Sequence, residues 1–176
     1  MIVLSEIQKC YDLLYVYDVE QQGWEQEPNG IQANLSHTLT HLVKDAYRKD
    51  FLNSQLVQEA IAPDNLMYAL RFVRWGDLSL SDVLKGSLEE NTRSNRSAWD
   101  IHAEAGDKIA DLIHEEDHRS SREVAVTQRS RKLNKAALLL ISSAQKQSAE
   151  YGFGLEKSFI RRLEQLRIRF NIPEPK

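Results

Sequence analysis

Residues 102–118, HAEAGDKIADLIHEEDH, concentrate side chains that bind metals or transfer protons. If this stretch is a helix with about 100° per residue, Asp107, Asp111, His114 and His118 lie on one face. Side chains at this spacing approach to about 5 to 6 Å between their Cβ atoms. Carboxylates one turn apart could therefore share Mg²⁺ or Mn²⁺, which prefer oxygen ligands, whereas the histidines would favour a softer metal.

The other side of the same helix is predicted to be buried because its residues are apolar at helical spacing. These residues are Ile101, Ala105, Ile109, Leu112 and Ile113. His102 points into this apolar arc, so we expect either a hydrogen-bonded core histidine or a group directed at a pocket. The acidic face has a simpler explanation than metal binding, since Asp, Glu and His side chains are stable on any solvated helix face.

The rest of the chain predicts an all-α fold, a helical bundle of about five to seven helices. Apolar residues recur at helical spacing, and no segment alternates with the period of two that a half-buried strand requires. The expected helices cover residues 5–22, 31–51, 63–76, 79–86, 97–118, 123–151 and 155–170. The polar stretch 87–97 is the best candidate for a linker, so the halves 1–86 and 97–176 are expected to pack as one compact unit.

The composition excludes several classes of protein, namely those with internal disulfides, cysteine-rich zinc sites or membrane-spanning helices. A single cysteine, Cys10, excludes an internal disulfide and a cysteine-rich zinc site, and its apolar surroundings predict a packed core thiol. The longest apolar run, AALLLI at 136–141, is too short to span a bilayer, and no basic segment precedes the first apolar residues. We therefore expect a cytoplasmic protein with no membrane partner.

Charge is unevenly distributed, because residues 1–90 carry a net −7 and residues 91–176 a net +4. The second half contains basic residues that could meet the phosphates of a nucleotide or of nucleic acid. These are Arg119, Arg122, Arg129, Arg131, Lys132, Lys135, Arg161, Arg162, Arg167 and Arg169. Acids such as Glu123, Glu156 and Glu164 lie between them and no ladder of aromatic residues accompanies them, so salt bridges are expected and nucleic acid is not.

Two segments of the first half resemble a known family. Residues 17–51, YDVEQQGWEQEPNGIQANLSHTLTHLVKDAYRKDF, and residues 62–84, APDNLMYALRFVRWGDLSLSDVL, are similar to the opening helices of MazG-like all-α nucleoside triphosphate pyrophosphohydrolases. The likeness covers about residues 5–85. It implies hydrolysis of a nucleotide between its α- and β-phosphates, with Mg²⁺ held by a Glu-Glu-x-x-Glu motif on one helix and a Glu-x-x-Asp motif on the next.

The catalytic acids of that family are largely missing at the matching positions. The first motif falls on residues 40–44, THLVK, which contain no acid, and the second keeps only Asp64. Residues 103–113, AEAGDKIADLI, also resemble the acid-bearing helix, with Glu104 and Asp107 on the second and third acid positions. Asp111 continues that face. The resemblance thus suggests two degenerate halves that share one cleft.

The resulting prediction is a divergent metal-dependent nucleotide pyrophosphohydrolase. Its metal ligands would be Glu104, Asp107, Asp111 and Asp64, its phosphate contacts Lys108 and Arg119, and its cofactor Mg²⁺ or Mn²⁺. A nucleotide ligand and a homo-oligomer are expected. One alternative is a non-catalytic helical module that binds another protein or a second copy through residues 135–144, KAALLLISSA, or through the first helix. Another is phosphate or nucleic-acid binding by the basic C-terminal helices.

Overall fold

The computed structural model describes residues 4–21, 30–47, 53–93, 95–117 and 123–172. Their regular elements are all helical, which confirms the all-α prediction, and no strand occurs within these ranges. Two π-helical segments, η1 (Val16–Gln21) and η4 (Val57–Ile61), continue α1 and precede α4. The α-helices are α1 (Leu4–Tyr15), α2 (Gly30–Tyr47), α3 (Ser54–Leu56), α4 (Ala62–Trp75), α5 (Leu80–Arg93), α6 (Ala98–Asp117), α7 (Glu123–Tyr151) and α8 (Leu155–Arg169).

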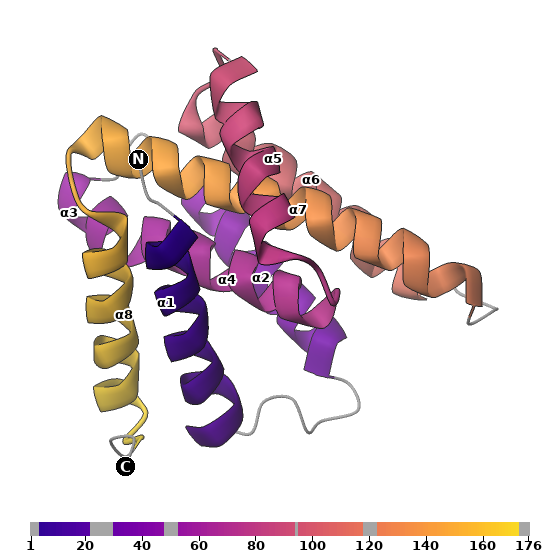
Figure 1. Ribbon diagram of the computed structural model, residues 1–176, viewed down its shortest axis with the longest axis horizontal. Coiled ribbons are helices and arrows are strands. Elements are labelled where there is room, and N and C mark those ends of the chain that lie inside the picture. The colour runs from indigo at the N-terminus through magenta and orange to yellow at the C-terminus, as the bar shows by residue number, and fades with distance from the viewer. Residues whose placement is uncertain (1–3, 22–29, 48–52, 94, 118–122, 173–176) are drawn as a thin grey trace.

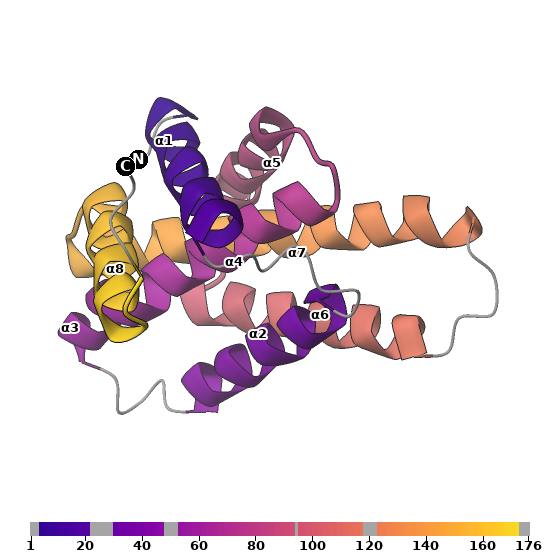
Figure 2. The same ribbon diagram turned by 90° about the horizontal axis from the view of Figure 1, so that it is seen from below.

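The long helix α7 is the centre of the bundle (Figures 1 and 2). It packs against α4, α5 and α6, while α2 packs against α6 and α8 packs against both α4 and α1. Helices α1 and α8 run side by side in the same direction at one end of the molecule (Figure 1). In the described part of the chain, no helix is long and apolar enough to cross a membrane.

Helix α7 is central because its middle is apolar on nearly every side. Its fully buried apolar residues are Leu133, Ala136, Ala137, Leu139, Leu140, Ile141 and Ala144. The alanines bring the neighbouring helices close, and the larger residues fill the space between them. The KAALLLISSA segment therefore forms the core, and the expectation that it offers a surface to a partner is wrong.

Local capping fixes where α6 begins. Asp100 N donates to Ser97 Oγ over 3.1 Å, and Ser97 N donates to Asp100 Oδ2 over 3.1 Å. This reciprocal pair is a capping box with Asp in place of Glu. The predicted linker at 87–97 needs correction, however, because α5 remains helical to Arg93 and buries Ser87 against α7, where Ser142 Oγ donates to Ser87 O over 3.0 Å.

His102 is a core residue, which confirms one of the two expectations for it. Its side chain is completely buried, with Nε2 3.1 Å from Leu42 O and Nδ1 3.2 Å from Asn65 Nδ2. Asn65 Nδ2 also donates to Gln147 Oε1 over 3.3 Å. One buried polar network thus connects α2, α4, α6 and α7, and it pairs both ring nitrogens of His102, which would be costly to leave unpaired.

Only part of the apolar face of α2 is buried. Leu35 and Leu42 are buried, but Val43 and Tyr47 are 59% and 87% exposed. Since α2 packs mainly on α6, only one side of its C-terminal turns is covered.

Candidate functional site

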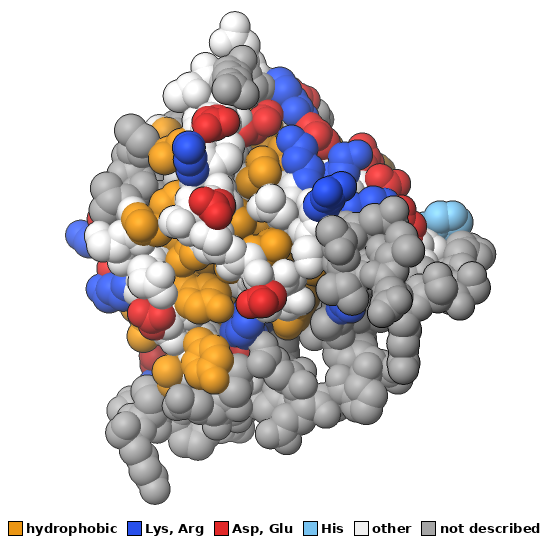
Figure 3. Space-filling model, turned by 45° about the vertical axis from the view of Figure 1, so that its right-hand side comes forward, with side chains coloured by type: hydrophobic (Ala, Val, Ile, Leu, Met, Phe, Trp, Pro, Cys, Tyr) orange, Lys and Arg blue, Asp and Glu red, His pale blue; other side chains and the backbone are white. Residues whose placement is uncertain are grey.

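Several of the described acids of α6 form ion pairs with nearby basic side chains. Glu104 forms ion pairs with Arg96 and with Lys135, the latter at 3.9 Å. Glu90 of α5 joins the same cluster through Lys135 at 3.6 Å. Acidic and basic side chains accordingly lie next to one another on the surface (Figure 3). Within the described ranges, no group of three or more His, Cys, Asp or Glu side chains is arranged to hold a metal ion.

The remaining residues predicted on this face are also on the surface. Asp107 is exposed, and Asp111 forms an ion pair with Lys108 at 3.6 Å, one turn away on the same helix. Lys108 therefore already has an acidic neighbour. Arg119 and His118 lie outside the described residues. The metal and phosphate roles assigned to this face remain predictions.

Asp64 lies elsewhere, in a cavity of about 260 Å³ at the start of α4. We call this cavity the Asp64 pocket. It is bordered by η1, α2, α4, α8 and the turn after α8. Its lining residues are Tyr17, His37, His41, Asp64, Met67, Tyr68, Arg71, Arg162, Leu166, Arg169 and Phe170. Neither Glu104 nor Asp107 nor Asp111 lines it, so Asp64 stands apart from the acids of α6.

Arg162 of α8 engages the carboxylate of Asp64 with two parallel hydrogen bonds. Its Nε donates to Oδ1 and its Nη2 to Oδ2, each over 2.8 Å. Burial alone would lower the pKa of Arg162, but the hydrogen bonds and the negative charge of Asp64 more than compensate and raise it. The guanidinium is therefore permanently charged and held in one orientation at the wall of the pocket.

A second arginine in the lining, Arg71, is held in place by a buried aspartate. Arg71 donates from Nε and Nη2 to the fully buried carboxylate of Asp18, over 2.8 and 2.6 Å. Arg74 donates to the same carboxylate over 2.8 Å. Two arginines thus share the buried carboxylate of Asp18, and one of them, Arg71, lines the cavity.

A third arginine, Arg169, lies at the end of α8 and is exposed. Its guanidinium carbon is 5.5 Å from the centre of the Phe170 ring. Among the residues that the structure describes, no carboxylate forms an ion pair with it. The lining itself thus contains three arginines, Arg71, Arg162 and Arg169, and one carboxylate, that of Asp64.

His37 and His41 form the α2 side of the pocket. They are one turn apart with ring centroids separated by 4.5 Å, and the Tyr68 ring lies 6.5 and 6.3 Å from them. Burial lowers the pKa of both imidazoles, and the positive charges of Arg71 near His37 and Lys44 near His41 lower it further. Both rings are therefore neutral at pH 7.

Lys44 also determines which nitrogen of His41 carries the hydrogen. Its Nζ lies 3.4 Å from His41 Nδ1, and an ammonium group can only donate. Nδ1 is thus the acceptor, and Nε2 of the neutral ring carries the hydrogen. His41 can consequently donate a hydrogen bond to a ligand through Nε2 without being charged.

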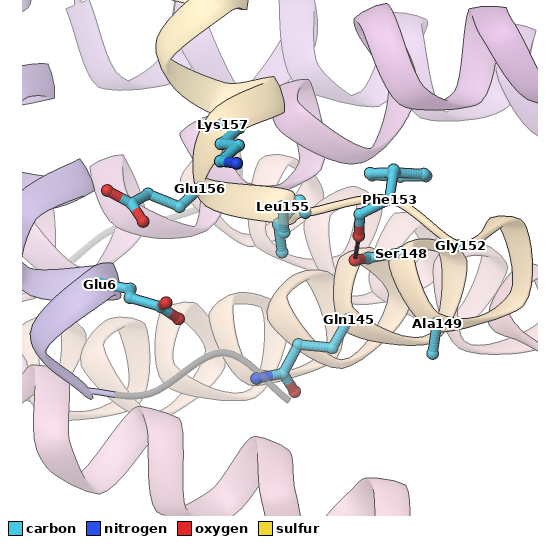
Figure 4. Close-up of a pocket in the computed structure, with 10 residues that line it drawn as sticks. Glu6, Gln145, Ser148, Ala149, Gly152, Phe153, Leu155, Glu156 and Lys157 are labelled. Atoms are coloured by element: carbon cyan, nitrogen blue, oxygen red, sulfur yellow. Dashed lines mark hydrogen bonds between the residues drawn. The ribbon is translucent and has the colours of Figure 1, made fainter.

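A larger cavity of about 470 Å³ lies at the turn between α7 and α8 (Figure 4). Its charged side chains are Glu6, Glu156 and Lys157, and Glu156 already pairs with Lys9 at 2.6 Å. Ser148 Oγ donates to Phe153 O and closes the turn instead of facing a ligand. The charged side chains of this cavity have both signs, and its serine hydroxyl is already used within the turn. The Asp64 pocket is therefore the better candidate for a ligand-binding site.

The other basic residues mostly serve as partners of nearby acids, as expected. Lys132 pairs with Glu115, and Arg161 pairs with Glu59 at 3.4 Å. Arg167 pairs with Glu164 at 2.8 Å within α8. This pairing balances the positive charge of several basic residues in the second half of the chain. Arg122 lies outside the described residues.

The sequence singles out Asp64, Arg162 and Arg169 but does not bring them together. His37 and His41 attract attention only as polar residues opposite the apolar stripe of α2, although their spacing of four residues places both on one face. A comparison with known protein families, curated proteins and solved structures finds no match to this chain.

Proposed function

We propose that the protein binds a small phosphate-bearing ligand of the nucleotide class in the Asp64 pocket. The observation that carries the proposal is the excess positive charge around this cavity, in particular Arg169, which none of the described carboxylates neutralises. Arginine is well suited to phosphate because its planar guanidinium presents several donors at once. The lining contains three arginines and one carboxylate, so an anionic group bound there would meet an excess of positive side chains.

Neutral groups of the lining favour the same ligand class. His41 offers Nε2–H as an uncharged donor, and the rings of His37 and Tyr68 provide faces on which a base could stack. At about 260 Å³ the cavity lies just below the range of roughly 300 to 1,000 Å³ that is typical of pockets for drug-sized ligands. This size favours one phosphate and one ring system over a complete triphosphate.

The resemblance to MazG-like enzymes supports a nucleotide ligand, and it further implies hydrolysis with Mg²⁺ or Mn²⁺. A panel of nucleoside triphosphates with either cation, assayed for pyrophosphate release, tests that activity. Release that is lost in Glu104→Gln or Asp107→Asn would place the activity on α6. A complete lack of release would leave binding as the function.

Binding itself is tested by isothermal titration calorimetry with AMP, inorganic phosphate and adenosine at low ionic strength. We expect saturable binding of AMP and phosphate and none of adenosine. Arg169→Gln should weaken AMP binding about tenfold, since a hydrogen bond to a charged group contributes roughly 1.5 to 3 kcal/mol. Arg167→Gln is the matched control, because Arg167 lies on the same helix but pairs with Glu164 and does not line the pocket.

Two results would refute the proposal. One is the lack of saturable binding of either AMP or phosphate to the wild-type protein. The other is equal weakening by Arg169→Gln and Arg167→Gln, because that would indicate attraction by overall charge and no defined site.

A further inference from the structure

The ion pair between Asp64 and Arg162 determines what else the Asp64 pocket can hold. Both oxygens of Asp64 accept hydrogen bonds from Arg162, and the two side chains are only 13% and 20% exposed. Partial burial protects such a pair from solvent screening, and the fork of the guanidinium matches the two oxygens of the carboxylate. The negative charge of Asp64 is thus already balanced inside the protein.

A divalent cation does not fit these surroundings. Mg²⁺ and Mn²⁺ bind to several oxygen ligands, usually including anionic carboxylates. Asp64 supplies the only carboxylate among the described lining residues, and three arginines share the lining with it. His41 Nδ1 accepts a hydrogen bond from the Lys44 ammonium, so this nitrogen is not available to bind a metal ion.

Arg162 still has donors to offer after it has paired with Asp64. A guanidinium carries five N–H groups, and Asp64 uses one on Nε and one on Nη2. The remaining donors, on Nη1 and Nη2, can reach a ligand without breaking the ion pair. Asp64 therefore acts on a ligand only through Arg162, which makes it a positioning residue.

From this geometry we infer that Arg162, held by Asp64, supplies the positive charge that a divalent cation would otherwise place against the ligand phosphate. Ligand binding in the Asp64 pocket is then independent of metal ions. The inference rests on the proposed function and specifies how the same pocket recognises its ligand. It also assigns Asp64 a role other than metal binding.

The first test needs no variant. AMP and inorganic phosphate are titrated into the wild-type protein in EDTA and, separately, in millimolar MgCl₂ or MnCl₂. We expect the dissociation constants in the two conditions to agree within about twofold, which corresponds to less than about 0.5 kcal/mol. Binding that occurs only with the cation, or that strengthens tenfold or more with it, would overturn the inference while leaving the proposed function intact.

The second test separates the charge of Arg162 from its orientation. In EDTA, Arg162→Gln should weaken AMP binding at least about tenfold. The AMP affinity of Arg162→Lys should lie between that of the wild type and that of Arg162→Gln, because lysine keeps the charge but lacks the forked guanidinium. Arg161→Gln is the matched control, since Arg161 is the preceding residue of α8, pairs with Glu59 and is 65% exposed. Wild-type affinity in Arg162→Gln would overturn the inference.

The third test concerns Asp64 as a positioning residue. A buried, charge-assisted hydrogen bond slows the exchange of the Arg162 Nε hydrogen with water, which nitrogen-15 NMR measures. In Asp64→Asn this exchange should become faster, and the affinity for AMP should fall. Unchanged exchange or unchanged affinity would exclude the positioning role. Circular dichroism verifies that each variant is folded. If the wild-type protein binds neither probe in any condition, the proposed function fails, and this inference fails with it.

Discussion

Asn65 of α4 and His102 of α6 are hydrogen-bonded in the core, with 3.2 Å between Asn65 Nδ2 and His102 Nδ1. The other nitrogen of the ring, Nε2, lies 3.1 Å from the carbonyl oxygen of Leu42, which can only accept. Nε2 therefore carries the hydrogen and Nδ1 accepts, so the folded protein holds His102 in one neutral tautomer.

The stability of the protein should fall with acidification because of His102. Burial lowers the pKa of His102 to about 4, with the bond to Leu42 opposing this in part, whereas the unfolded chain has the ordinary value of 6.5. Between these two pKa values the unfolded state binds more protons than the folded state. The contribution of neutral His102 to the free energy of unfolding is therefore fully present above about pH 6.5 and is lost as the pH falls toward 4. The loss should be on the order of 3 kcal/mol in the free energy of unfolding, measured by urea denaturation at several pH values.

His102→Asn provides the control for this pH dependence. The substitution removes the titrating group, so the variant should be less stable at pH 7 but should show a shallower dependence between pH 4 and 6.5. His37 and His41 contribute in the same direction because their pKa values are also lowered by burial. An equally steep dependence in His102→Asn would assign the whole effect to other groups.

Asp18→Asn should be strongly destabilising. Asp18 is completely buried and accepts from both Arg71 and Arg74, so its neutralisation removes the carboxylate that the two guanidinium groups share. Removing one partner from a buried ion pair typically costs about 3 to 5 kcal/mol, which chemical denaturation would detect. Asp12→Asn, at an exposed position on α1 that accepts from Gln8, should change stability by less than about 0.5 kcal/mol. Equal effects of the two substitutions would contradict this account.

Substitution of the exposed α6 acids should leave the Asp64 pocket intact. Asp107→Asn and Asp111→Asn alter surface residues that do not line the pocket, so AMP affinity should stay within about twofold of wild type. Titration calorimetry of the double variant measures this. A tenfold loss would instead favour the predicted cleft shared by the acids of α6 and Asp64.

Cys10 should be unreactive until the protein unfolds. Its side chain is fully buried, and burial, assisted by the charge of Glu156, raises the pKa of the thiol to about 12. Only the thiolate reacts with a disulfide reagent, so labelling at pH 8 should follow the urea unfolding curve. Since Cys10 is the one cysteine in the sequence, the signal is unambiguous. Rapid labelling of the native protein would show that α1 opens locally.

Local features of the fold were predictable because they depend on neighbouring residues. The capping box at Ser97 and Asp100, the bounds of α7 and the buried position of His102 all follow from helical spacing and short-range hydrogen bonding. The sequence does not predict the end of α5, because residues 87–93 are polar enough to suggest a loop. Their helical conformation depends on contact with α7, which no local pattern contains.

The candidate site was harder to predict because it depends on pairs that are distant in sequence. Asp64 and Arg162 are 98 residues apart, and Asp18 and Arg71 are 53 apart. Periodicity places a charged residue on a helix face but does not reveal which helix will cover that face. Asp64 was therefore identified as a candidate ligand, whereas its pairing with Arg162 becomes evident only in the folded protein.

The adjacent positions of α1 and α8 determine when the Asp64 pocket can form during synthesis. Tyr17, directly after α1, and Arg162, on α8, both line the Asp64 pocket, so the cavity combines early and late parts of the chain. A nascent chain that still lacks α8 cannot pair Asp64 with Arg162. Ligand capture during synthesis must therefore wait until the last described helix has left the ribosome.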